Sequence, residues 1–261
     1  MEEKALLSLV KDAPKVLEQV YTDLAQPSVQ AVGRALGTVF EFSTSMLLPV
    51  KLLNEKFKLN FAKRLNEYKE KLEAIPEKKR CEVHPQIGTP IIEKLTYTTT
   101  DEIADLFTTL LCNASNVDKV NVAHPSFVGI IEHLSTDEAR IIKYLKGKKD
   151  IEYCTLNGNL LTGKGHIVLL QRATLIPCRV ELDYPNNIGA YLSNLVSLGI
   201  LVDKSGSWKV DTKVTDEICK EIHLEKLRAD FVPSQFKSIE VERSFLEVTE
   251  FGKLFITACV G

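Results

Sequence analysis

The stretch TTDEIADLFTTLLCNA, residues 99–114, carries the most regular helical pattern in the chain. Its apolar side chains recur at steps of three and four residues, which places them on one face of an α-helix. These side chains belong to Ile103, Leu106, Phe107, Leu110, Leu111 and Ala114. Thr99 and Glu102 have the spacing of a capping box, in which both side chains bind free N–H groups at a helix start. The stretch therefore predicts an amphipathic helix within a helical bundle.

Helical patterns flank this stretch on both sides. After it, residues 124–134 predict another helix, and Ser135 with Glu138 forms a second capping box. Before it, the basic segment 51–75 has a narrow apolar seam at helical spacing. Pro76 ends that segment, because proline disfavours helical backbone in the residue before it. These patterns predict a mainly α fold with an N-terminal helical bundle.

The last third of the chain has a mixed pattern. Residues 167–170 and 240–248 are rich in the β-branched and apolar side chains that strands prefer. Between them, a helix is expected over residues 187–198, and Gly199 suits the left-handed position that ends many helices. Residues 200–210 then predict a hairpin. The order of helix, helix, hairpin and strand is typical of a winged-helix domain.

The expected organisation therefore has three parts. Residues 1–80 hold the N-terminal helices, with an apolar segment at 31–53 and a basic helix at 51–75. Residues 81–134 form a helical bundle, and residues 135–261 form a winged-helix-like α+β domain.

The composition of the 261-residue chain is that of an ordinary globular protein, with 44% hydrophobic and 26% charged residues. Its formal net charge of -2 lacks the strongly basic balance of many nucleic-acid-binding proteins. The six cysteines form no C-x-x-C pair, so neither a zinc ribbon nor a thioredoxin-like redox motif is expected. The chain starts with acidic residues and lacks the basic and apolar parts of a signal peptide, which favours a cytoplasmic location.

Several short stretches occur in a characteristic order. They are LGTV (36–39), LLPV (47–50), IP (75–76), VHP (83–85), IGTP (87–90), DLF (105–107), LL (110–111), HPSFV (124–128), LS (134–135) and DEA (137–139). Over residues 36–145 the chain thereby resembles the abortive infection alpha (Abi-alpha) family of bacterial proteins. The resemblance implies an all-α domain and a role in phage defence, in which an infected cell dies or stops growing before the phage spreads. It implies no established catalytic residues.

No motif predicts an enzyme. The stretch GNLLTGKG, residues 158–165, is close to a P-loop, but Gly165 stands where a P-loop has the Ser or Thr that binds Mg²⁺. A P-loop also leads into a helix, whereas the residues after Gly165 have the pattern of a strand. The five histidines are not at H-x-x-x-H or H-E-x-x-H spacing. We therefore expect no catalytic residue, no cofactor and no metal ion.

The apolar segment 31–53 permits two interpretations. As a helix it would present Arg34, Thr38, Glu41 and Ser45 in one polar stripe. The first interpretation is the central helix of a soluble bundle, with the stripe facing a groove. The second is a helix that inserts into a membrane on activation, with the stripe facing a pore or a partner helix. The first is favoured, because each charged residue at the membrane centre costs about 2.5–3.5 kcal/mol.

Two further surfaces are candidates for anionic partners. Residues 51–80 carry ten Lys or Arg and five Glu, which permits a peripheral contact with anionic lipid or nucleic acid, although a solvated helix face is favoured. The winged-helix-like domain offers five candidate nucleic-acid contacts, namely Asn187, Tyr191, Asn194, Lys204 and Lys209. Its expected recognition helix has no Lys or Arg, whereas duplex binding depends on basic contacts to phosphates. A domain used for protein contact or as a scaffold is therefore favoured.

The favoured function is non-catalytic phage defence by abortive infection, through contacts with a protein partner or a phage component. One alternative is a membrane-perturbing effector that uses residues 31–53, and it would place the protein at the membrane on activation. Another alternative is a winged-helix DNA-binding regulator.

Overall fold

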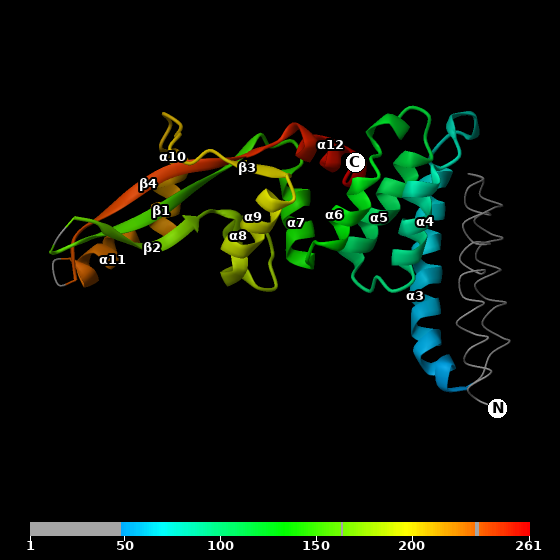
Figure 1. The fold of residues 1–261 in the computed structure, drawn as a ribbon, viewed down its shortest axis with the longest axis horizontal. Helices are drawn as coiled ribbons and strands as arrows, with labels where there is room; N and C mark the ends of the chain where they lie inside the picture. Colours follow the sequence, from blue (N-terminus) through cyan, green and yellow to red (C-terminus); the bar gives the residue numbers. More distant parts are fainter. Residues whose placement is uncertain (1–47, 163, 233–234) are drawn as a thin grey trace. The chain divides into compact units, whose positions relative to one another are not determined.

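The computed structural model describes residues 48–162, 164–232 and 235–261 (Figure 1). The chain divides into two compact units. Unit 1 contains the described residues up to Ala139 together with Leu254–Gly261, and unit 2 contains Arg140–Lys253. The predicted domain boundaries after residues 80 and 134 stay predictions.

Part of the sequence-based expectation concerns residues outside this description. Arg34, Thr38, Glu41 and Ser45 all precede residue 48, so their predicted stripe lies outside the described residues. Within the described part of the chain, no helix is both long and apolar enough to cross a membrane.

Unit 1 is helical. Its elements are α3 (Leu48–Glu73), α4 (Pro85–Leu95), α5 (Asp101–Ala114), α6 (Ser126–Glu132), the first turn of α7 (Thr136–Leu145), the end of α12 (Glu250–Cys259) and 3-10 turns at Glu77–Lys79 and Val120–Val122. The predicted helix at 99–114 is confirmed as α5, which contacts α3, α4 and α6. Its apolar face is buried, including Phe107 and Leu110. The helix at the centre of unit 1 is therefore the one with the most regular apolar period.

The two predicted capping boxes have different outcomes. Ser135 and Glu138 form one, because the Ser135 N–H donates to Glu138 Oε2 at 2.7 Å and the Glu138 N–H donates to Ser135 Oγ at 3.3 Å. The box predicted for Thr99 and Glu102 is wrong, because α5 begins one residue later, with Thr100 as its N-cap and no side-chain cap hydrogen bond. Both segments match the capping-box pattern equally well, so the pattern alone does not determine the residue at which the helix begins. The surrounding structure does.

Ion pairs join α3 to α5. Arg64 is buried, with 1% of its surface exposed, and donates to Asp101 Oδ1 at 2.8 Å and to Glu67 Oε1 at 2.9 Å. Lys63 Nζ also lies 2.8 Å from Asp101 Oδ1, and Lys71 Nζ lies 2.7 Å from Asp105 Oδ1. Part of the positive charge predicted for this basic helix therefore faces carboxylates of the same chain.

Unit 2 is built on a four-stranded antiparallel sheet with the order β2-β1-β4-β3 (Figure 1). The strands are β1 (Asp150–Leu160), β2 (His166–Ala173), β3 (Leu201–Asp203) and β4 (Phe236–Val248). The helices are α8 (Ile176–Arg179), α9 (Ile188–Ser197), α10 (Lys213–Glu221) and α11 (Leu224–Phe231), with a 3-10 turn at Pro185–Asn187. The fold is therefore mainly α and mixed α+β.

Helices α10 and α11 pack on the sheet through two small apolar clusters. In the first, Ile218 of α10 contacts Cys154 of β1. In the second, Leu224 of α11 contacts Leu156 of β1 and Ile239 of β4. The buried side of the sheet is thus the side that carries these β1 and β4 side chains.

The strand predictions in unit 2 are confirmed in part. The segments 167–170 and 240–248 lie in β2 and β4, and the predicted helix is α9, followed by Gly199 at a φ of +73°. The hairpin predicted for 200–210 is wrong, because β3 pairs with β4 and the segment after Asp203 forms no return strand. Strand β1 was not predicted. Its Asn and Gly residues weaken the strand signal, and pairing with the next strand β2 on one side and the distant β4 on the other supplies what local propensity lacks.

Candidate functional site

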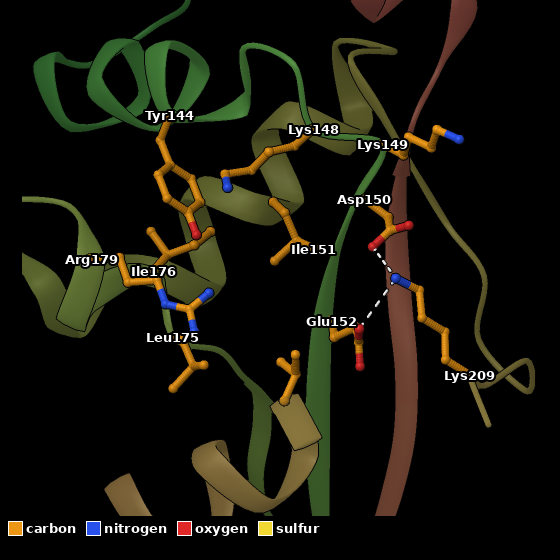
Figure 2. Close-up of a pocket in the computed structure, with 11 residues that line it drawn as sticks. Tyr144, Lys148, Lys149, Asp150, Ile151, Glu152, Leu175, Ile176, Arg179 and Lys209 are labelled. Carbon is orange, nitrogen blue, oxygen red and sulfur yellow. Dashed lines mark hydrogen bonds and ion pairs between the residues drawn. The ribbon is translucent and has the colours of Figure 1, made fainter. Parts of the chain in front are cut away.

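A pocket of about 350 Å³ lies in unit 2, at the start of β1 (Figure 2). Its lining comes from α7, β1, α8, the segment after β3 and the start of α10. The residues are Tyr144, Lys148, Lys149, Asp150, Ile151, Glu152, Leu175, Ile176, Arg179, Lys209 and Val214. The apolar members form part of the wall, and the charged members determine what the pocket can do chemically.

The two carboxylates of the pocket share one cation. Lys209 Nζ donates to Asp150 Oδ1 at 2.6 Å and lies 3.2 Å from Glu152 Oε1 (Figure 2). Partial burial by itself lowers the pKa of Lys209, but the two carboxylates outweigh it and hold the pKa above its usual value. Lys209 is therefore protonated at neutral pH, and the carboxylates are engaged by it.

The opposite side of the pocket carries Tyr144, Lys148 and Arg179 (Figure 2). The ammonium of Lys148 lies 4.3 Å from the centroid of the Tyr144 ring, a cation–π contact. Arg179 donates to Glu217 Oε2 at 2.8 Å, and its hydrogen bonds with Tyr144 and Glu217 raise the pKa of its guanidinium. These contacts tie α7, α8 and α10 to one another.

The chemistry of the pocket follows from these contacts. The residues that line it include no histidine, cysteine or serine, so it holds none of the Ser–His or Cys–His pairs of covalent catalysis. In the described part of the chain, no group of three or more His, Cys, Asp or Glu side chains is placed to hold a metal ion. Among the charged residues of the pocket, Lys209 and Arg179 cross-link separate elements.

A second candidate feature is the outer strand of the sheet. Ile167, Val168, Leu169 and Leu170 are four consecutive residues of β2 with 38% to 51% of their surface exposed. We call these four residues the β2 patch. Strand β2 pairs with β1 on one side and is the outermost strand on the other. The patch therefore combines exposed apolar side chains with a free sheet edge.

The structure does not bring the five predicted nucleic-acid contacts together as a free basic surface. Tyr191 is buried in α9, Asn194 of the same helix is half-buried, and Asn187 is exposed in the preceding 3-10 turn. Lys204 Nζ lies 3.0 Å from Glu247 Oε2, and Lys209 is held by the two pocket carboxylates. The charge of both lysines is thus offset by carboxylates of the same chain.

The pocket was not predicted from the sequence, and residues 167–170 were predicted as a strand but not as an exposed surface. The pocket has no sequence signal, because its charged residues come from segments far apart in the chain. The patch has one: residues 167–170 form an unbroken apolar run, whereas a strand with one solvated face shows alternation. That run indicates either a strand buried on both faces within the fold or a strand that is covered by a binding partner.

The fold and these two features define a mixed α+β protein, mainly α, with an ion-paired pocket and an apolar sheet edge. The chain belongs to the abortive infection alpha family, whose model matches residues 54–259. The match begins after the LGTV and LLPV stretches and includes the sheet of unit 2. Within the range of the resemblance, the described residues 48–145 form helices and no sheet strand, as it implies, whereas the family match extends further and includes the β-sheet.

The other comparisons give little more. No curated protein matches the chain. The chain is similar to a solved structure described as an uncharacterized protein from the hydrocarbon-degrading marine bacterium Alcanivorax borkumensis SK2. The two share 19% identity at a TM-score of 0.34, over 56% of this chain and 96% of the other.

Proposed function

We propose that this protein acts in abortive infection without catalysis, by binding another protein through the β2 patch. Family membership supports this cellular role. The single observation that carries the mechanism is the exposure of four consecutive apolar residues on the outer strand of the sheet.

The physical argument concerns both the side chains and the backbone of β2. Single exposed apolar residues are common on protein surfaces, but contiguous exposed runs mark interaction sites. A sheet edge also presents unpaired N–H and C=O groups that accept another strand. Together, apolar side chains and a free edge are the features of β-strand addition, a common way to bind an extended segment.

The state of the pocket supports a role without catalysis. Lys209 binds both pocket carboxylates, and Arg179 is held by Glu217 and Tyr144. Groups held in this way serve to fix the surrounding elements. A general base would need a titratable group within reach of a substrate and free to accept its proton.

We also propose that part of unit 2, which we call its base, is winged-helix-like. The chain passes in order through α7, β1, α8, α9, β3 and β4, and the three strands lie in the order β1-β4-β3. In this scheme β2 is an extension paired to β1, and α10 with α11 is an insertion between β3 and β4. The base then serves as a scaffold, because Lys204 and Lys209, the two basic candidates for DNA contact, are paired with carboxylates.

Phage plaquing tests the proposal. We expect at least one phage in a broad panel to form fewer plaques on cells that express the wild type than on cells without the protein. Val168→Lys should remove this protection, because an ammonium in the patch must lose its hydration to be covered by a partner.

Val117→Lys is the matched control. Val117 is 55% exposed, close to the 50% of Val168, and lies in a turn after α5. This variant should protect as the wild type does. Unchanged plaquing of every phage on wild-type cells would count against the proposed role, and full protection by Val168→Lys would count against the proposed surface.

A further inference from the structure

The β2 patch lies on a strand whose two edges differ. Toward β1, the pairing is regular from His166 to Val168 and then irregular, with shifts in register opposite Leu156 and Cys154. Among the described residues, the opposite edge of β2 has no neighbouring strand in the sheet order. The other end of the sheet is β3, which has only three residues. Strand β2 is therefore the longer open edge of this sheet, and an open edge invites pairing with another chain.

The charges along β2 restrict what can pair with it. Residues 167–171 carry no charged side chain, and the nearest charges are Lys164 before the strand and Arg172 near its end. Arg172 is already bound within the chain, because it donates to Asp203 Oδ2 at 2.7 Å and to Ser193 Oγ at 2.8 Å. The central part of the strand thus offers no charge to attract an acidic or a basic partner.

An uncharged centre is what a strand needs to pair with its own copy. In a twofold antiparallel pair, each residue near the axis faces itself or a close neighbour from the other chain. A charged residue there would face its own charge, which is destabilising. The small net charge of the chain adds little repulsion between two copies.

We infer that β2 pairs antiparallel with β2 of a second copy, joining the two sheets edge to edge. This inference rests on the proposed function, since it names the partner of the β2 patch. The pair is centred on Val168, the last residue of β2 before its pairing with β1 becomes irregular. This register places Ile167 opposite Leu169 of the second copy, so apolar residues face apolar residues across the axis.

Sedimentation of the purified full chain tests the inference. The wild type should sediment as a dimer, and Val168→Lys should weaken dimerisation by at least about 100-fold, because like charges that face each other in an interface cost several kcal/mol. Val117→Lys should remain a dimer. Circular dichroism and thermal unfolding should show that both variants are folded, since each replaced side chain is half-exposed.

A charge-reversal mixture makes the test specific to self-pairing. Val168→Glu alone should also be monomeric, whereas a mixture of Val168→Lys and Val168→Glu should form a mixed dimer, because residue 168 then faces the opposite charge. Amide hydrogen exchange in residues 166–170 should slow as the wild-type concentration rises. A wild type that stays monomeric at high micromolar concentration, a Val168→Lys variant that remains a dimer, or a charge-reversed mixture without dimers would each overturn the inference.

The outcomes separate this inference from the proposed function. If the wild type is monomeric and Val168→Lys still loses phage protection, the patch binds a different protein and only the self-pairing is wrong. If the dimer forms as described and the monomeric Val168→Lys variant protects fully, the pairing is correct and the proposed use of the patch in defence is wrong.

Discussion

Arg64 in unit 1 and Val168 in unit 2 both depart from the usual burial of their residue types. Arg64 is a charged residue with 1% of its surface exposed, and Val168 is an apolar residue with half of its surface exposed. The difference lies in what surrounds them. Arg64 has two carboxylates and the Thr99 carbonyl oxygen within hydrogen-bond distance. In the described part of the chain, Val168 has only the paired strand β1 beside its own strand.

The unusual burial of Arg64 has a structural explanation, whereas the unusual exposure of Val168 points to function. The buried guanidinium of Arg64 is paired with carboxylates of the same chain, although its Nε has no hydrogen-bond partner among the described residues. The partly exposed Lys209 is likewise paired with carboxylates. The described residues leave the apolar side chains of β2 exposed, which is typical of a surface that binds a partner. Function is therefore to be sought at the β2 patch, and the following substitutions test whether the two regions differ as described.

The largest effect on stability is expected from Arg64→Ala. It removes a buried side chain and its hydrogen bonds to Asp101 and Glu67, which should lower the free energy of unfolding by about 2–4 kcal/mol. Urea denaturation measures the change. Arg64→Met should recover much of the loss, because it refills the space and the two carboxylates are exposed enough to be hydrated. An equal loss in both variants would show that the ion pairs, rather than packing, dominate.

A smaller effect is expected from Lys209→Ala in the pocket. Asp150 and Glu152 are only 20% and 16% exposed, so removing their shared cation should cost about 1–2 kcal/mol, less than for a fully buried pair. Lys204→Ala is the matched control. Its partner Glu247 is 47% exposed, and this change should cost less than about 1 kcal/mol. Equal losses would contradict the description of the pocket as an ion-paired cross-link.

The stabilisation of the folded state by the Lys209 ion pairs should also depend on pH. The pKa of Lys209 is raised in the folded state, so its stabilisation is fully present below the unfolded pKa of about 10.4. It is lost as the pH rises through the higher folded pKa. Unfolding measured across this alkaline range should show a smaller decline in Lys209→Ala than in the wild type.

The smallest effect on stability is expected from Val168→Lys. Its side chain is half-exposed on an edge strand, so under monomeric conditions the free energy of unfolding should change by no more than about 0.5 kcal/mol. Dilute thermal or urea unfolding measures it. A loss as large as that of Lys209→Ala would mean that Val168 supports the fold itself, and the contrast with Arg64 would no longer hold.

Local pattern predicted much of unit 1 and individual pieces of unit 2. Helix α5, the cap at Ser135, strands β2 and β4 and the position of Gly199 all follow from signals within a few residues of one another. The hairpin prediction failed because the partner of β3 is more than thirty residues away in β4. A strand's sequence does not specify the distance along the chain to the strand that pairs with it.

The sequence by itself determined several of the helices, two of the extended segments and the resemblance to the abortive infection alpha family, because periodicity and short motifs are local properties. Only the tertiary structure decided that Asp150, Glu152 and Lys209 meet in one pocket and that the apolar run in β2 stays exposed. Both depend on long-range packing. Whether a charge is paired or an apolar side chain is covered is settled by neighbours that the chain brings together only when it folds.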